Sequence, residues 1–127
     1  MHQKTFTFKK GVYNDLSSNP EAMVTIIKCG KHKFTLKDFK EQIGHDDSLP
    51  YVAYLCVDKI PIARCFNDGW GGTTELSPIT SQRALFDEME AFVQTYHWAL
   101  GKSFKFDVKL DFIADTLACT HASMSKV

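Results

Sequence analysis

The sequence predicts an α+β fold: an antiparallel sheet of about five strands, with one long amphipathic helix and shorter helices packed on one face. Three observations predict it. Several short segments alternate apolar and polar residues or are rich in β-branched residues, which is typical of strands. Two apolar runs are separated only by Asp58-Lys59, the length of a tight hairpin turn. A longer segment repeats apolar residues at helical spacing between Leu85 and Leu100.

The predicted strands lie in the first half of the chain. In order, they are residues 5–8, 23–29, 31–36, 51–57 and 60–66. Gly30 breaks the second from the third and predicts a hairpin there. The last two strands are apolar on both faces, so we expect them at the centre of the sheet. Residues 11–20 are rich in turn-forming residues and predict a loop.

Helices are predicted in two places. Leu36, Phe39 and Ile43 are three and four residues apart, which predicts a short helix at residues 36–43 that Gly44 ends. Ser77-Pro78, or Thr80 three residues later, predicts the start of a long helix that Gly101 ends. Its apolar stripe consists of Leu85, Met89, Phe92, Val93, Tyr96 and Leu100.

The end of the chain is ambiguous in its local pattern. Residues 104–118 fit a helix that Asp107 caps, but they also alternate as a strand would. Both interpretations stay open, with the helix preferred. From His121 onward we expect a loose tail.

Length and charge limit the class of protein. The chain has 127 residues, which fits one domain over residues 1–127. Fifteen basic residues balance fifteen acidic ones, so the sequence lacks the broad positive charge of a dedicated nucleic-acid binder. A local basic patch remains possible, interrupted by Asp38 and Glu41. It consists of Lys28, Lys31, Lys33, Lys37 and Lys40.

The N-terminal residues do not resemble a secretory signal, and no apolar run reaches the length of a membrane span. We therefore expect a cytoplasmic protein without a membrane partner. Three of the four cysteines, Cys29, Cys56, Cys65 and Cys119, lie in apolar segments and are expected to be small buried hydrophobic residues. No C-x-x-C pair is present, so a structural zinc site has little support. No metal and no cofactor is predicted.

The most unusual segment is a glycine-rich loop after the last predicted strand. It consists of Asn67, Asp68, Gly69, Trp70, Gly71 and Gly72. Backbone N–H groups in such a loop can bind an anion when a helix follows. The segment lacks the residue order of a dinucleotide site or a P-loop. Alternatively, it is a structural turn in which Trp70 packs against the core. Both interpretations stay open, and these six residues are the candidate site for a partner or ligand.

Catalytic arrangements have little support. Asp107 and Lys109, followed by Asp111 and Asp115, resemble the acidic-plus-lysine pattern of metal-dependent nucleases. Such a site needs further carboxylates, for which only Asp58 and Asp68 are available, and a solvated helix face is the simpler explanation. Cys65 or Cys119 could pair with His97 as a nucleophile, but no sequence signature surrounds either thiol. No catalytic residue is assigned, and an enzyme is not predicted.

The stretch from Tyr51 to Gly72, with the amphipathic helix after it, resembles small uncharacterised proteins of bacteriophages and mobile elements. The resemblance depends on Asn67, Asp68, Gly69, Gly71 and Gly72, and covers the middle and C-terminal two-thirds of the chain. It departs at Asp58-Lys59, where Asp-Gly is expected. It implies no reaction. It implies a setting in which small single domains bind host proteins, including components of host defence.

The leading hypothesis is a small interaction protein that inhibits a bacterial defence complex, CRISPR-type or similar, by binding a host protein through the glycine-rich loop. An alternative is a binder of a phosphorylated small molecule or nucleotide at the same loop. A third is a small metal-dependent nuclease. The oligomeric state and the identity of the partner stay open.

Overall fold

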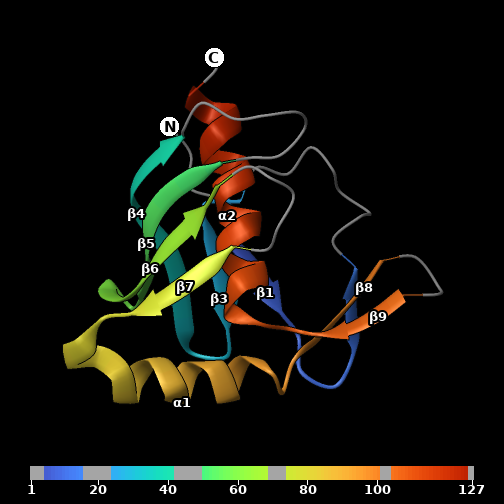
Figure 1. The fold of residues 1–127 in the computed structure, drawn as a ribbon. Helices are drawn as coiled ribbons and strands as arrows, with labels where there is room; N and C mark the ends of the chain where they lie inside the picture. Colours follow the sequence, from blue (N-terminus) through green and yellow to red (C-terminus); the bar gives the residue numbers. More distant parts are fainter. Residues whose placement is uncertain (1–4, 16–23, 42–49, 69–73, 101–103, 126–127) are drawn as a thin grey trace.

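The computed structural model describes residues 5–15, 24–41, 50–68, 74–100 and 104–125, and Figure 1 shows the α+β fold that they form. The elements are β1 (Thr5–Phe8), β2 (Tyr13–Asp15), β3 (Ile26–Cys29), β4 (His32–Glu41), β5 (Tyr51–Val57), β6 (Ile60–Asn67), β7 (Glu75–Pro78), the 3-10 helix η1 (Thr80–Gln82), α1 (Arg83–Val93), β8 (His97–Leu100), β9 (Phe104–Asp107) and α2 (Leu110–Ser125). The strands form one sheet of six and one of three.

The large sheet has the order β1-β3-β4-β5-β6-β7, with β1 parallel to β3 and all other neighbours antiparallel. Both predicted hairpins, β3-β4 and β5-β6, are confirmed. Asp58 and Lys59 have φ angles of 49° and 72°, the positive values that a type I′ hairpin turn requires. Gly30, with φ of 58°, supplies the left-handed conformation at the other turn. The hairpin of β5 and β6 lies in the interior of the sheet, as expected.

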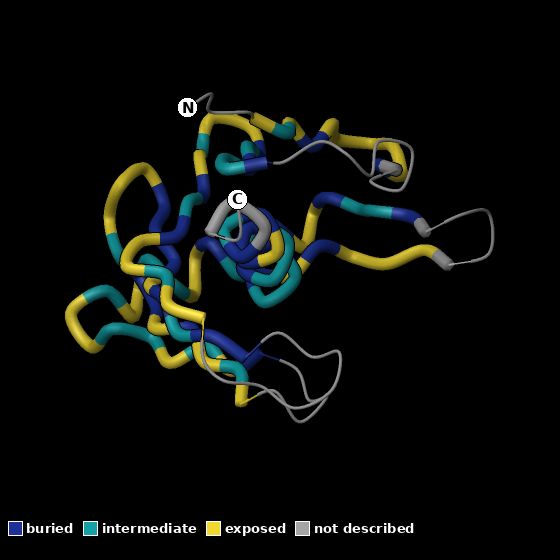
Figure 2. Tube along the Cα trace, turned by 90° about the horizontal axis from the view of Figure 1, so that it is seen from above, coloured by how far each residue is buried: buried dark blue, intermediate teal, exposed yellow. Residues whose placement is uncertain are grey.

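Helix α2 lies in the curve of the large sheet, and the core forms between them. Figure 2 shows the helix end-on with the strands bending around it. The inward-facing residues of β5 are Tyr51, Ala53, Leu55 and Val57, all buried. The fully buried residues of α2 are Leu110, Ile113, Ala114, Leu117 and Ala118. Met89 and Val93 of α1 belong to the same hydrophobic cluster, so the helices and the large sheet share one core.

The small sheet has the order β2-β8-β9 and lies beside the start of α2 (Figure 1). Its strand β2 is parallel to β8, and β8 is antiparallel to β9. The buried Asn14 joins β2 to its surroundings: Nδ2 donates to the carbonyl oxygens of His97 at 2.7 Å and Lys9 at 3.1 Å. Trp98 stacks on Phe112 of α2 with ring centroids 4.2 Å apart, which attaches the sheet to the helix.

The predicted fold class is wrong in its architecture. The main sheet has six strands and a second sheet has three, where one antiparallel sheet of about five strands was expected. The pairs β1-β3 and β2-β8 are parallel. In the described residues the α-helices are α1, with 11 residues, and the longer α2, with 16, so there is no single long helix accompanied by shorter ones.

The short helix predicted at residues 36–43 is wrong, because β4 continues through this segment to its end at Glu41. A β-bulge interrupts the register between Lys37 and Lys40. The extra residue of the bulge lets Leu36 and Phe39 both face the core, although they are three residues apart. The three-residue spacing of Leu36 and Phe39, which predicts a helix, therefore reflects a bulged strand.

The long helix predicted from Ser77-Pro78 to Leu100 is also wrong. Ser77 and Pro78 pair with β6 as part of β7, and α1 covers only Arg83–Val93. The backbone N–H of Tyr96 donates to the carbonyl of Val93 at 3.0 Å, after which β8 begins. Because β8 pairs with a strand on each side, tertiary hydrogen bonding outweighs the helical pattern of its residues.

Three smaller expectations are corrected. The loop predicted at residues 11–20 contains β2. Residues 104–118, left open between strand and helix, contain both, since β9 precedes α2. The tail expected from His121 is helical as far as Ser125. The predicted helix-ending residues Gly44 and Gly101 lie outside the described residues.

Candidate functional site

The glycine-rich loop begins where β6 ends. Asn67 is the last residue of β6 and Asp68 follows it, whereas Gly69, Trp70, Gly71 and Gly72 lie outside the described residues. The side-chain Nδ2 of Asn67 donates to Oγ1 of Thr74 at 3.2 Å. This bond joins the residues that enter and leave the loop. The structure therefore describes the two residues that flank the loop, Asn67 and Thr74, and we call this pair the base of the loop.

A polar network lies beneath this base. Thr74 is buried and donates its hydroxyl proton to Oδ1 of Asp115 on α2. The hydroxyl oxygen of Tyr51, a fully buried residue of β5, lies 3.0 Å from the same Oδ1 and 3.3 Å from Oγ1 of Thr74. The network therefore links the end of the loop, the centre of the large sheet and the helix in its curve.

Burial controls the electrostatics of this network. Desolvation raises the pKa of Asp115 above the ordinary carboxyl value, although the hydrogen bonds from Thr74 and Tyr51 oppose the shift. The charge of Asp111 one turn away raises it further. Desolvation likewise raises the pKa of Tyr51, so its hydroxyl keeps its proton and acts as a donor. These groups hold the base of the loop in place.

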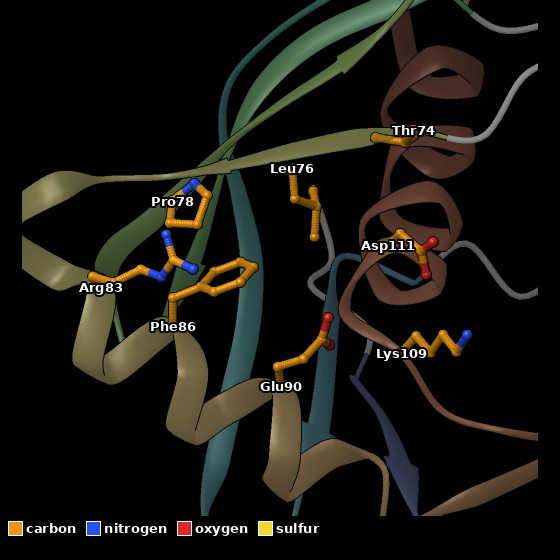
Figure 3. Close-up of a pocket in the computed structure, with 8 residues that line it drawn as sticks. All are labelled: Thr74, Leu76, Pro78, Arg83, Phe86, Glu90, Lys109 and Asp111. Atoms are coloured by element: carbon orange, nitrogen blue, oxygen red, sulfur yellow. The ribbon is translucent and has the colours of Figure 1, made fainter.

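A cleft with a volume of about 460 Å³ lies next to Thr74, between β7, α1 and the start of α2. Figure 3 shows the side chains that line it: Thr74, Leu76, Pro78, Arg83, Phe86, Glu90, Lys109 and Asp111. Leu76, Pro78 and Phe86 supply apolar surface. The remaining lining is polar or charged.

The cleft has equal numbers of positive and negative side chains, and some of them already interact with neighbouring residues. Arg83 and Lys109 supply two positive charges, and Glu90 and Asp111 supply two negative ones. Arg83 Nε contacts Asp87 at 3.3 Å. Glu90 Oε2 accepts the backbone N–H of Leu110 at 3.2 Å, so this carboxylate caps the start of α2. A ligand that carries both charges fits this lining better than a phosphate group, which the two carboxylates would repel.

The carboxylates of the proposed nuclease arrangement lie apart. Asp107 Oδ1 contacts His97 Nδ1 at 2.8 Å, whereas Asp115 belongs to the buried network. Asp58 lies in the turn of the β5-β6 hairpin, and Asp68 lies at its open end. Within the described ranges, no group of three or more His, Cys, Asp or Glu side chains could hold a metal ion. The suggested supplementary carboxylates are thus at opposite ends of one hairpin.

The cysteines do not form the suggested nucleophile pairs. Cys29, Cys56 and Cys65 are free thiols in the core, as predicted, whereas Cys119 is exposed. Burial raises the pKa of Cys29 and Cys65 to about 12, so neither ionises near neutral pH. The ring of His97 has Asp107 as its hydrogen-bond partner.

The small sheet presents a second candidate surface. Val12, Tyr13 and Phe106 are large apolar residues there, exposed by 43–49%. The ring of Tyr13 packs 5.2 Å from that of His97, and Lys105 Nζ lies 5.0 Å from the centre of the Tyr13 ring. Tyr13, His97 and Lys105 lie on one face of the sheet, which we call the small-sheet surface, whereas Phe106 pairs with Trp98 and lies on the opposite face. Phe106 stacks on Trp98 at 4.6 Å, so its ring is held in a defined position.

Sequence reasoning did not identify either the network or the small-sheet surface. Asp115 was assigned to a solvated helix face, yet it sits between buried pairs of the α2 sequence, Ile113-Ala114 and Leu117-Ala118. An acidic residue inside such a stripe signals a partner within the fold. No comparable signal marked Thr74, whose partners come from distant segments.

Comparison with known protein families, with curated proteins and with solved structures gives no match for this chain. Among the described helices, none has the length and apolar character needed to cross a membrane.

Proposed function

We propose that this domain acts by binding a partner protein, and that the small-sheet surface is its main contact. The exposed ring of Tyr13, which lies beside His97 and Lys105 on one face of the small sheet, supports the proposal. Aromatic side chains concentrate binding energy at protein interfaces, because they bury a large area at a small cost in conformational entropy. The ring of Tyr13 is already ordered by its contacts with His97 and Lys105, which lowers that cost further.

In its specific form, the proposal is that the partner is a component of a bacterial defence complex and that binding inhibits it. Its support is the resemblance of the residues around Asn67 and Asp68 to small proteins of phages and mobile elements. The buried network beneath Thr74 fixes the two ends of that loop, and a fixed base favours a loop that is used for contact.

The test is affinity capture from bacterial lysates with the wild-type chain and two variants. Tyr13→Ala removes an aromatic ring from the small-sheet surface. Ile60→Ala is the matched control, since Ile60 is an apolar residue exposed by 41% at the β5-β6 turn. We expect Tyr13→Ala to weaken binding of the captured partner at least tenfold, about 1.4 kcal/mol, and Ile60→Ala to leave it unchanged.

Equal binding by the wild type and Tyr13→Ala would contradict the proposed surface. The inhibitory form is tested separately, by expressing the chain in bacteria that carry a defined defence system and measuring phage plaques. Restored plaque formation with the wild type, and its loss with Tyr13→Ala, is the expected result. Unchanged defence with a chain that still binds its partner would contradict inhibition.

The cleft favours a second candidate function, binding of a small molecule that carries both a positive and a negative charge. It adjoins Thr74 at the end of the glycine-rich loop and contains Arg83 and Lys109. A ligand at a hundredfold its dissociation constant stabilises a protein by about 2.7 kcal/mol, which thermal unfolding detects. A zwitterionic small molecule, such as a free amino acid, that raises the melting temperature of the wild type, but not of Lys109→Ala, would support this candidate. Equal shifts in both proteins would contradict binding in the cleft.

A further inference from the structure

The face of the large sheet that points away from α2 combines positive charges with aromatic rings. Successive side chains of a strand point to opposite faces. Since Tyr51, Ala53 and Leu55 of β5 face the core, Tyr54 faces outward. In the sheet register, Tyr54 lies opposite Lys37 of β4 on one side and opposite Arg64 of β6 on the other. These three residues form a row across the centre of the sheet.

A second row lies beside the first. Val52 pairs with Lys40 on β4 and with Phe66 on β6. Further along the sheet, Lys28 of β3 pairs with Lys33 of β4. We call this surface the outer face, and it consists of Lys28, Lys33, Lys37, Lys40, Val52, Tyr54, Arg64 and Phe66.

The outer face is positively charged, although the chain as a whole has no net charge. The chain has fifteen basic and fifteen acidic residues, yet this face carries five cations. Nearby acids are Glu75, which pairs with Phe66, Asp38, whose charge acts on Cys56 of the same face, and Asp58, which accepts the backbone N–H of Lys33. Across the described part of the chain, the ion pairs use His32, Arg83 and His97 as their basic partners. The five cations of the outer face are therefore available to an external anion.

Two aromatic rings lie among these cations. Tyr54 is 37% exposed and Phe66 is 42% exposed. Phe66 lies two residues beyond Arg64, the cross-strand partner of Tyr54, so the two rings are diagonal neighbours on adjacent strands. Such neighbours lie about 7–8 Å apart. Tyr54 thus has a basic residue on each side, and Phe66 lies two residues from Arg64 on the same strand, with Val52 and Glu75 as its cross-strand neighbours.

We propose that the outer face binds single-stranded nucleic acid. Phosphates would contact the lysines and Arg64, and two unpaired bases would stack on Tyr54 and Phe66. An anionic polymer with aromatic units matches both components of this surface, whereas an acidic protein or a lipid headgroup matches only the charge. A duplex keeps its bases stacked and exposes only their edges in the grooves, so its bases cannot stack on Tyr54 and Phe66. The proposal is independent of the small-sheet surface and goes beyond protein binding.

The test is fluorescence anisotropy with labelled 15-nucleotide single strands of DNA and RNA, titrated with the full chain at several salt concentrations. For single strands, the logarithm of the binding constant falls with the logarithm of salt concentration by about 0.7 per phosphate contacted. Five contacts would give a slope of about −3.5. Replacing Lys37 and Arg64 by Gln should reduce its magnitude by about 1.4. Lys9→Gln with Lys10→Gln removes the same charge from the β1-β2 turn and should keep the wild-type slope.

Stacking is tested separately. Tyr54→Leu with Phe66→Leu keeps apolar side chains but removes both rings, and we expect affinity for the single strand to fall at least tenfold. Circular dichroism confirms that each variant is folded before its affinity is compared. Preference for DNA or RNA shows which polymer supplies the strand. Absence of binding at low salt, unchanged affinity of the leucine variant, or equally tight binding to duplex DNA or to phosphatidylserine vesicles would overturn the proposal.

Discussion

Replacing Tyr51 by Phe removes one hydroxyl group from the buried network and keeps the packed ring. The lost hydroxyl lies 3.0 Å from Asp115 Oδ1 and 3.3 Å from Thr74 Oγ1. A hydrogen bond to a charged group contributes about 1.5–3 kcal/mol to stability. Because Asp115 is partly exposed, we expect the lower end of this range, a loss of about 1.5 kcal/mol in the free energy of unfolding at pH 7.

The measurement is urea unfolding followed by circular dichroism. Tyr54→Phe is the matched control, since it removes the same hydroxyl from the same strand at a residue 37% exposed on the opposite face. Surface substitutions of this kind change stability by less than about 0.5 kcal/mol. Equal losses in the two variants would show that the Tyr51 hydroxyl does not stabilise the fold through Asp115 and Thr74.

The same variant has a predicted pH dependence. The pKa of Asp115 is raised in the folded state, so its contribution to stability is present at low pH and is lost as pH rises through the folded pKa. The hydrogen bond from Tyr51 favours the charged carboxylate and limits this loss. Tyr51→Phe should therefore cost more stability at pH 7 than at pH 4, and an equal cost at both pH values would refute the role of the carboxylate charge.

Three further predictions follow from burial, backbone conformation and capping. Native protein treated with iodoacetamide should gain one adduct, at Cys119, and mass spectrometry showing rapid modification of all four cysteines would contradict the buried positions of the others. Gly30→Ala should lower the free energy of unfolding by about 1–2 kcal/mol, since φ is 58° there and an added Cβ would lie 3.0 Å from a tyrosine hydroxyl. Glu90→Ala should cost about 1 kcal/mol by removing the acceptor of the Leu110 N–H, whereas the exposed Glu88→Ala should cost little in the same denaturant titration.

Local patterns predicted the parts of the fold that local interactions determine. The β3-β4 and β5-β6 hairpins follow from Gly30 and from two turn residues between apolar runs, so chain neighbours suffice to specify them. The burial of Cys29 and Cys65 follows from the apolar runs that contain them. These features need no knowledge of distant partners.

The remaining features depend on partners far away in the chain. Residues 97–100 continue a helical pattern, but they form β8 because β2, over 80 residues earlier, and β9 both pair with them. The candidate network has the same origin, since Tyr51, Thr74 and Asp115 meet only after the large sheet has closed around α2. The sequence located the start of the glycine-rich loop at Asn67, yet it gave no indication of what holds that loop.

The bulge in β4 connects one error in the predicted fold, the short helix at residues 36–43, to the proposed nucleic-acid surface. Without an extra residue, strict alternation after Lys37 would turn Phe39 outward and Lys40 into the core. With the bulge at Asp38, whose φ is 55°, Phe39 packs 5.6 Å from the ring of Tyr51, and Lys40 pairs with Val52 on the outer face. One residue in a left-handed conformation therefore satisfies two demands: it keeps an aromatic ring in the core and adds a cation to the charged surface. The i, i+3 spacing of Leu36 and Phe39, which predicts a helix, is a consequence of this bulge.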